Sequence, residues 1–421
     1  MKTKSFVFTL LLASLLASLL TGCGAPANAS EVRSNLPRQS ASAPQEDILE
    51  LTRGGSEFTF DLLKALADTP GNLVFSPYSI SQAMAMAYAG ARGDTEAQMA
   101  AVLRYSLPQE RLHPAFNSLE QALTAPAAEK GAFTLKIANA LWAQQDYPFR
   151  QEYLDLLASS YGAGLRVTDF SKDPEAARGL INRWVEEQTN GLIKDIVPPG
   201  AINDLTRLVL ANAIYFKADW IGPFQKDSTI PQPFTLADGS VIQTPMMNQM
   251  GYFNYMVEDD LSAVELPYMG GRTAMLVIIP AAGKFEAVQA RLSANELERI
   301  LARLQGGQVL LGLPKFKYES SLNLKQVLKA LGLNAPFEDG ADFSGMDGSR
   351  DLRITDILHK AVIAVDEQGT EAAAATVIIV GATSAPAEPV TIRAERPFFF
   401  LIRDTQTGAV LFAGRVSNPA E

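Results

Sequence analysis

The sequence predicts an α+β fold in which helices dominate the first half of the chain and strands dominate the second. Two observations predict this fold. Apolar residues recur at helical spacing in three early segments, and six later runs are rich in β-branched and aromatic residues. A hydrophobic content of 47% and a mean hydropathy of +0.04 predict a well-filled globular core.

The first 22 residues form a predicted export signal. Lys2 and Lys4 supply a positive end, residues 5–20 are almost wholly apolar, and Leu-Thr-Gly-Cys at 20–23 closes the segment. This ending resembles the lipobox of bacterial lipoproteins, which implies cleavage before Cys23 and attachment of a diacylglycerol to its thiol. The alternatives are an ordinary secretory signal with a chance cysteine, or a short membrane span, for which the apolar run is short. Cys23 is the sole cysteine, so no intramolecular disulfide can form.

Residues 23–45 are predicted to be the lipidated cysteine and a flexible tether, because Ala, Ser, Pro and Asn dominate and large apolar side chains are scarce. Anchor and tether would hold the following domain some nanometres from an extracytoplasmic bacterial membrane, at the outer membrane, in the periplasm or at the cell surface. No linker or repeat interrupts residues 46–421. We therefore expect one domain there, and a monomer.

The charge of the chain narrows its partners. A formal net charge of -10 and an isoelectric point near 5.0 argue against nucleic acid and heparin-like polyanions, since binding phosphate or sulfate needs clustered Lys and Arg.

Three helices are predicted from amphipathic spacing and end signals. Ser56 to Ala67 carries apolar residues on one face, and Pro77 to Ala91 opens with a Ser-Pro start. Ala176 to Thr189 is amphipathic and stops at Asn190-Gly191. The predicted strands are Leu208 to Lys217, Thr273 to Ile279, Gln308 to Leu313, His359 to Val365, Phe398 to Arg403 and Ala409 to Val416.

The segment from Asp366 to Ile392 carries signals for two conformations. Glu371 to Ala375 favours a helix, Val377 to Val380 favours a strand, and Pro386 and Pro389 favour exposed extended chain. In a sheet, one face of the segment would carry only small, β-branched or apolar residues: Thr370, Ala372, Ala374, Thr376, Ile378 and Val380. The alternative interpretation is an Ala-rich helix followed by a buried strand and a linker.

Catalytic motifs are scarce. Histidine-dependent catalysis would have to use His113, which precedes Pro114 in a predicted polar loop, or His359. The sequence contains no G-x-S-x-G elbow, H-E-x-x-H helix, Walker-type loop or cysteine pair. We expect no enzyme, cofactor or metal site, with a secreted hydrolase using one of these histidines and a serine as the alternative.

Residues 367–376 resemble the hinge of an inhibitory serpin. The hinge residues are Glu367, Gly369, Thr370, Glu371, Ala372, Ala373, Ala374, Ala375 and Thr376. Further serpin-like motifs follow in the order of the family: NLVFSPYS from Asn72, NAIYFK from Asn212 with Trp220 and Pro223-Phe224, LPY from Leu266, GADFSG from Gly340, PFFF from Pro397 and GRVSNP from Gly414. They cover essentially everything after the predicted tether, and the chain is identified as a member of the serpin family.

The resemblance implies about nine helices, three β-sheets and an exposed reactive loop at about residues 367–391. A target serine or cysteine protease would cleave this loop. Its N-terminal arm would then enter the main sheet as a central strand and distort the trapped acyl-enzyme, so that the inhibitor is consumed. The resemblance also implies two polar clusters under the sheet and at its top: a shutter of Ser76, Ser79, Asn212 and His359, and a breach of Trp220, Lys315 and Glu367.

Counting from Gly369 as in the family places the reactive bond at Thr383-Ser384, with Ala382-Thr383 and Ser384-Ala385 as alternatives. No Lys or Arg lies between Gly369 and Ile392. The buried carboxylate of a trypsin-like pocket would be left unpaired by Thr or Ala, whereas a shallow apolar pocket accepts them. We expect elastase-like or subtilisin-like targets, with papain-like cysteine proteases as an alternative.

A serpin-fold protein that binds or acts as a chaperone without inhibiting is the alternative function. Such proteins commonly carry bulky, charged or proline residues in the hinge, and between Thr370 and Thr376 none lies at an inward position.

Overall fold

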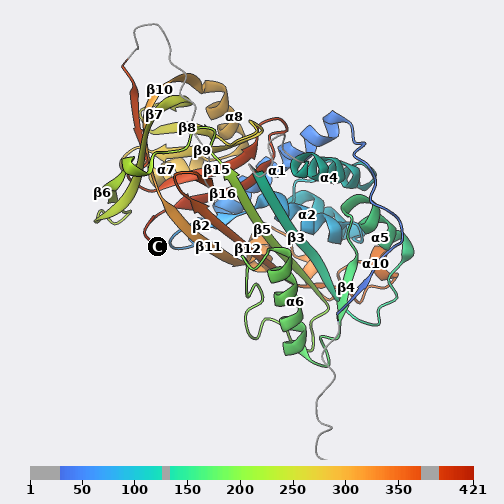
Figure 1. The fold of residues 1–421 in the computed structure, drawn as a ribbon. Coiled ribbons are helices and arrows are strands. Elements are labelled where there is room, and N and C mark those ends of the chain that lie inside the picture. Colours follow the sequence, from blue (N-terminus) through green and yellow to red (C-terminus); the bar gives the residue numbers. More distant parts are fainter. Residues whose placement is uncertain (1–28, 126–132, 371–387) are drawn as a thin grey trace, which may run out of the picture.

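The computed structural model describes residues 29–125, 133–370 and 388–421 and confirms the α+β fold. Within these ranges the chain forms ten α-helices and two hydrogen-bonded sheets (Figure 1). The predicted signal peptide and Cys23 lie outside the described residues.

The main sheet has seven strands, and it holds the hinge residues Gly369 and Thr370 and the shutter residues Asn212 and His359. Their spatial order is β1 (Ser30–Val32), β4 (Leu165–Thr168), β3 (Phe133–Gln144), β5 (Leu208–Asp219), β13 (Gly369–Thr370), β12 (Ile354–Val365) and β11 (Phe316–Asn323). The sequence did not reveal β3, although its register with β5 is continuous from Phe133 to Ala143.

The second sheet has nine strands. Its order is β14 (Val390–Arg393), β10 (Gln305–Pro314), β7 (Val241–Val257), β8 (Leu261–Pro267), β9 (Thr273–Pro280), β15 (Phe398–Asp404), β16 (Val410–Val416) and β2 (Leu73–Phe75), with β6 (Thr229–Thr235) on β7. The long strand β7 pairs with β6, β10 and β8 in turn, so hydrogen bonding joins two of the three implied sheets into one.

The helices are α1 (Gln45–Ala65), α2 (Pro77–Tyr88), α3 (Gly93–Val102), α4 (Gln109–Thr124), α5 (Gln151–Leu156), α6 (Pro174–Gln188), α7 (Phe285–Arg291), α8 (Ala294–Arg303), α9 (Leu324–Ala330) and α10 (Ser344–Asp347). Shorter turns are η1 (Leu157–Tyr161), η2 (Lys226–Ser228) and η3 (Ala335–Phe337). Side-chain caps begin two predicted helices: Ser76 accepts a hydrogen bond from the backbone of Ser79, and Asp173 accepts one from Ala176.

His113 corrects one expectation. It lies in α4, not in a polar loop, and its side chain is buried, with Nδ1 2.6 Å from the Tyr161 hydroxyl. The following residue, Pro114, lies in the first turns of the helix, and the sequence-based prediction took it for a loop signal.

Successive side chains of β5 point to opposite faces of the main sheet, and each face packs against a different helix. Leu208, Leu210 and Ile214 belong to the large core with α2, whereas Val209 and Ala211 pack against α6 on the opposite face. Figure 1 shows α6 crossing β3 and β5 near one end of the main sheet. The side chain of Asn212 therefore points toward the start of α2.

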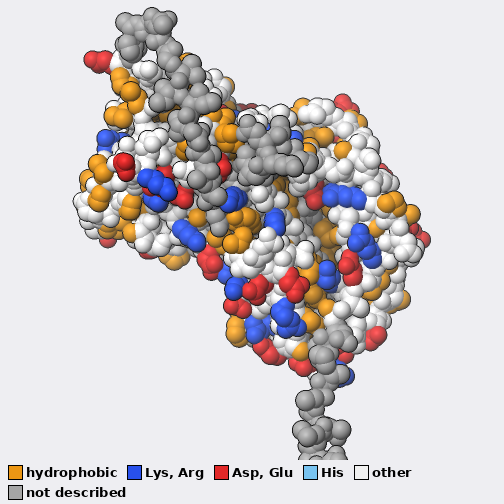
Figure 2. Space-filling model, viewed as in Figure 1, with side chains coloured by type: hydrophobic (Ala, Val, Ile, Leu, Met, Phe, Trp, Pro, Cys, Tyr) orange, Lys and Arg blue, Asp and Glu red, His pale blue; other side chains and the backbone are white. Residues whose placement is uncertain are grey.

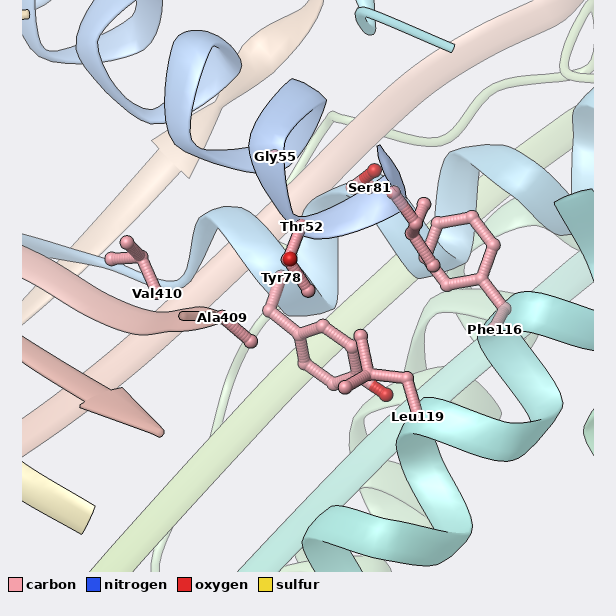
Figure 3. Close-up of a pocket in the computed structure, with 9 residues that line it drawn as sticks. Thr52, Gly55, Tyr78, Ser81, Phe116, Leu119, Ala409 and Val410 are labelled. Carbon is pink, nitrogen blue, oxygen red and sulfur yellow. The ribbon is translucent and has the colours of Figure 1, made fainter. Parts of the chain in front are cut away.

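Little free volume remains between α1, α2, α4 and β16. The cavity between α1, α2, α4 and β16 in Figure 3 measures about 20 Å³, room for about one water molecule. It is too small to hold a substrate.

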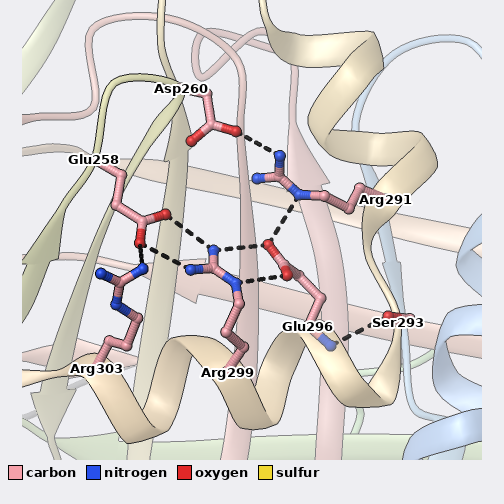
Figure 4. A network of polar contacts seen from close by, with 7 residues as sticks. All are labelled: Glu258, Asp260, Arg291, Ser293, Glu296, Arg299 and Arg303. Atoms are coloured by element: carbon pink, nitrogen blue, oxygen red, sulfur yellow. Dashed lines mark hydrogen bonds and ion pairs between the residues drawn. The ribbon is translucent and has the colours of Figure 1, made fainter.

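A network of charged side chains fastens α8 to the turn between β7 and β8 (Figure 4). Arg299 donates to Glu258 at 2.8 and 3.0 Å and to Glu296 at 2.8 Å, while Arg291 also pairs with Glu296 at 3.0 Å. Hydrogen bonds from Arg299 are the main reason that the pKa of Glu258 is lowered. Because Arg299 pairs with Glu296 on its own helix and with Glu258 in the turn, the network fixes the helix to the hairpin.

The structure corrects the predicted flexible tether. Ser30–Val32 forms β1, antiparallel to β4, and α1 begins at Gln45 instead of the predicted Ser56. We call residues 30–43 the N-terminal strap.

Polar groups of α4 and η1 hold the rest of the strap. Arg38 donates to Asn117 Oδ1 at 2.8 Å and to Glu120 Oε2 at 2.9 Å. The Ser118 hydroxyl accepts from the backbone nitrogens of Ser42 and Ala43, each at 3.0 Å. These bonds are made by backbone groups and polar side chains. The prediction of a free tether was therefore wrong, because it considered only the scarcity of large apolar residues.

Replacing Arg38 should loosen the strap. Arg38→Ala loses charge-assisted hydrogen bonds that stabilise the attached strap by about 1.5 kcal/mol. The equilibrium population of the detached strap should therefore rise about tenfold. The measurement is the rate of tryptic cleavage after Arg33. Arg53→Ala is the control, because the Arg53 side chain pairs with Glu50 on the exposed surface of α1. Equal cleavage rates after Arg33 in both variants would contradict the assigned role of Arg38.

Candidate functional site

The first residues of the predicted reactive loop lie inside the main sheet. After β12 ends at Val365, the chain turns, and β13 pairs antiparallel with β12 on one side and with β5 on the other. Glu367 and Thr370 are 5% and 1% exposed. This corrects the expectation of an exposed loop from about residue 367, because the open ends of β5 and β12 offer backbone partners that the sequence does not show.

The turn before β13 is fixed by its own side chain and by a glycine. Asp366 Oδ1 accepts from the backbone nitrogens of Gln368 at 2.9 Å and Gly369 at 3.3 Å. A Cβ at Gly369 would lie 2.1 Å from the backbone oxygen of Ala218. Glycine is therefore required for the close approach of β13 to β5.

Thr370 is the only member of the predicted inward set that the described residues include. It pairs with Ala218 and Val365, which both belong to the large core, and its hydroxyl lies 2.6 Å from that of Tyr268. The parity predicted for Thr370 is confirmed. The other inward positions, the hinge residues Glu371 to Thr376 and the predicted reactive bond (Thr383, Ser384, Ala382 and Ala385) lie outside the described residues.

The structure brings the breach residues together around the turn. Lys315 Nζ donates to Glu367 Oε2 at 2.8 Å, and Trp220 Nε1 donates to the backbone oxygen of Asp366 at 3.1 Å. The Trp220 ring stacks on Tyr268 with centroids 4.4 Å apart. Burial alone would raise the pKa of Glu367, but hydrogen bonds, led by that from Lys315, hold it below its ordinary value.

Beyond β13, the strands β5 and β12 are hydrogen-bonded directly to each other. Leu208 to Ile214 of β5 pairs directly with Ile354 to Ala361 of β12, and the two strands are parallel. We call this pairing the seam. A chain that continued from Thr370 into the sheet would run antiparallel to both strands and would have to separate them.

The shutter residues lie across the seam. His359 on β12 is paired in register with Asn212 on β5, and its Nδ1 contacts Asn212 Oδ1. The backbone nitrogen of Ser76 donates to His359 Nε2 at 3.1 Å, so Nδ1 carries the proton and donates to Asn212. Asn212 Nδ2 in turn donates to the Ser79 hydroxyl at 2.6 Å. All four predicted residues are thus in one hydrogen-bonded cluster.

Sequence reasoning missed two members of this cluster. Asn139 on β3 pairs in register with Asn212 and contacts its side-chain amide, and Asn139 Nδ2 donates to Gln82 Oε1 at 2.9 Å. The available signal was an asparagine inside an otherwise apolar run. It would have indicated a buried polar partner if β3 had been recognised.

Both histidines are poorly placed for catalysis. His359 and His113 are 1% and 2% exposed, and burial lowers the pKa of each from 6.5 to about 3. They are neutral at physiological pH and lie away from solvent, which argues against the hydrolase alternative.

The described ranges contain no group of three or more His, Cys, Asp and Glu side chains suited to a metal ion. In the same ranges, every helix is too short or too polar to cross a membrane.

Comparison with known proteins gives a consistent family assignment. The family model described as Serpin (serine protease inhibitor) matches residues 53–419. An uncharacterised serpin-like protein of Thermococcus kodakarensis is 44% identical, over 87% of this chain and 85% of the relative. The leukocyte elastase inhibitor of Homo sapiens is 38% identical, over 88% of this chain and 100% of the inhibitor.

Solved structures agree. The thermophilic serpin tengpin in its native state has a TM-score of 0.83 at 27% identity, covering 93% of this chain and 100% of that chain. Uncleaved ovalbumin has a TM-score of 0.79 at 29% identity, covering 88% of this chain and 100% of that chain.

Substituting Gly369 should displace β13 from the sheet. In Gly369→Ala the new methyl group meets backbone, which cannot rotate away, at a cost of about 1–3 kcal/mol. We expect faster hydrogen exchange at residues 369–370 and altered Trp220 fluorescence, because its indole loses the bond to Asp366. Gly222→Ala is the control, since no atom lies within 4 Å of its added Cβ. Identical exchange and fluorescence in both variants would show that β13 is not seated by this contact.

Acid should destabilise the folded chain through its two histidines. The unfolded state takes up a proton as pH falls below 6.5, whereas each folded histidine resists protonation down to about pH 3. Stability is therefore lost as pH falls through this window, by up to about 1.4 kcal/mol per pH unit for each histidine.

Urea unfolding of His359→Gln and His113→Gln between about pH 6 and pH 4 tests this linkage. Each variant should lose part of the pH dependence of the unfolding free energy. Only His359→Gln should also change the rate at which the seam opens, because His113 lies in α4, away from it. Unchanged pH dependence in both variants would refute the assignment.

Proposed function

The chain belongs to the serpin family, and from this premise we propose that it is a suicide inhibitor of serine endopeptidases with elastase-like or subtilisin-like specificity. The observation that carries the proposal is the seated hinge. β13 occupies the open end of the seam, and the pairing of β5 with β12 begins just beyond it. The chain is thus positioned to continue into the sheet once it is free to move.

Insertion would be favourable for a reason visible in the register. The entering chain would replace one parallel ladder with two antiparallel ladders, and antiparallel pairing is somewhat more stable per residue. Each added backbone bond contributes about 1 kcal/mol net. The extra ladder therefore supplies a large decrease in free energy.

The uncut chain cannot gain this free energy, because both ends of the loop are fixed. β13 holds one end in the main sheet, and β14 holds the other against β10 in the second sheet. Full insertion would carry the loop toward Leu208, at the far end of β5, while Val390 stays in place. Cleavage by the target protease removes this restraint, so we assign the native state as a kinetic trap.

The proposed specificity rests on the loop composition and on the relatives. The absence of Lys and Arg between Gly369 and Ile392 disfavours trypsin-like targets. Several relatives are named leukocyte elastase inhibitors, from Homo sapiens, Equus caballus and Bos taurus. Papain-like cysteine proteases are the second target class to test.

We also propose that the chain is exported and lipid-anchored at Cys23 on the outside of a bacterial membrane. The support is the lipobox-like sequence at 20–23, which follows a charged and then apolar segment. A protease encountered there would be in the extracytoplasmic space.

Incubation with elastase and with subtilisin tests the proposal. We expect an SDS-stable 1:1 complex, and the first residue of the released C-terminal peptide identifies the reactive bond. Thr370→Arg should convert the inhibitor to a substrate, because the arginine charge would occupy the buried site beside Tyr268 and prevent insertion. Cleaved protein should then accumulate while protease activity persists.

Thr391→Arg is the matched control, since this exposed residue lies in β14, beyond the inserting arm. It should retain complex formation. Absence of a stable complex with every serine and cysteine protease tried would favour the non-inhibitory binding function, and an unaffected Thr370→Arg would contradict the insertion mechanism.

A further inference from the structure

The N-terminal strap fixes where the chain leaves the folded body. β1 pairs with β4 at Ser30 and Val167, and β4 lies beside the end of β3 that pairs with Leu208, the first residue of β5. The hinge pairs with Ala218 and Asp219, at the last residues of β5. The strap therefore leaves the body at the end of the main sheet opposite the hinge, and Figure 1 shows β4 at one end of the molecule and β7 and β10 at the other.

The length of β5 sets the separation of these two points. It spans Leu208–Asp219, and at about 3.3 Å per residue its eleven steps measure about 36 Å. The described residue at the start of the predicted reactive loop, Thr370 in β13, lies at the end far from Ser30.

The chain available to reach a membrane is shorter than this separation. From Cys23 to Ser30 there are seven residue steps, which span at most about 25 Å when fully extended. The originally predicted tether, from Cys23 to Gln45, would have spanned about 75 Å and would have allowed any orientation. An orientation with the hinge against the bilayer would place Ser30 about 36 Å above it, out of reach of Cys23.

We propose that the strap mounts the inhibitor on a lipid bilayer with the hinge and reactive loop held away from the membrane. This inference rests on the proposed lipid attachment at Cys23. The strap bonds made by Arg38 and Ser118 keep residues 30–43 from acting as additional tether. Their role is to set the position of the reactive loop relative to the membrane.

The charge of the protein opposes adsorption of the folded body onto an anionic membrane. Without Lys2 and Lys4 of the signal segment, the formal net charge of -10 becomes -12, and this charge is repelled by anionic lipid headgroups. On the face shown in Figure 2, Lys and Arg side chains are interspersed with Asp and Glu around α6, without a basic patch that would hold this face flat on such a surface. The mounted inhibitor would meet proteases that are dissolved in the surrounding phase.

Energy transfer to the bilayer tests the orientation directly. The chain from Cys23 onward is joined through its only thiol to a maleimide phospholipid in phosphatidylcholine vesicles that carry an acceptor dye. A fluorescent amino acid is placed at Leu205 or at Tyr252, which are 60% and 76% exposed. Leu205 lies just before β5, at the strap end of the sheet. Tyr252 lies in β7 near Gln249, whose side chain contacts Gly222 beyond the hinge end of β5.

We expect transfer to be several-fold stronger from position 205 than from position 252. A 20-residue Gly-Ser insertion between Cys23 and Ser30 should reduce this difference, as should Arg38→Ala to a smaller extent. Equal transfer from the two positions, or stronger transfer from 252, in the chain without insertion would overturn the proposal.

Failure of the mounting is distinguishable from failure of the proposed function. The chemical linkage makes the transfer experiment independent of natural processing, which is read separately from the mass of the N-terminal peptide after export from a bacterial host. Protease inhibition is measured with the unlinked protein in solution, so its loss would leave the orientation result unaffected.

Discussion

The parallel pairing of β5 with β12 is the constraint on which the other features depend. β5 is buried on both faces along most of its length, and the two strands offer backbone partners to a third strand at the end where β13 enters. The His359 contact with Asn212 crosses the same pairing, so the sheet opens only if a hydrogen bond between neutral, buried groups is broken. Leaving two buried polar groups without partners raises the free energy by more than their hydrogen bond lowers it. The closed seam is therefore stable, and opening it must pass a free-energy barrier.

The two ends of the main sheet have different tasks. At one end, Gly369 allows β13 to approach β5, and Trp220, Tyr268, Lys315 and Glu367 surround the turn that leads into it. At the other end, β1 extends the sheet through β4 and fixes the exit of the N-terminus. The length of β5 separates the two, so a single rigid element sets the relation between the proposed membrane anchor and the proposed reactive loop.

The histidines illustrate how a structural role can look catalytic in a sequence. Two histidines and many serines permit a hydrolase hypothesis, but His359 accepts from the backbone of Ser76 and donates to Asn212, which uses both of its nitrogens for structure. Burial keeps the ring neutral. Protonation of His359 at Nε2 would remove the acceptor for the Ser76 backbone nitrogen and break this part of the shutter. The stability of the fold in acid is therefore linked to the opening of the sheet.

The sequence by itself determined the fold class, the central helices and strands, the family resemblance and the residues of the shutter and the breach, because apolar periodicity, end signals and short motifs are local. Tertiary structure decided the rest. The position of β13 inside the sheet, the place of Asn139 in the shutter, the helical setting of His113 and the attachment of residues 30–43 all depend on hydrogen bonds between groups far apart in the chain. Backbone donors and acceptors are nearly the same at every residue, so no local pattern shows which of them will meet.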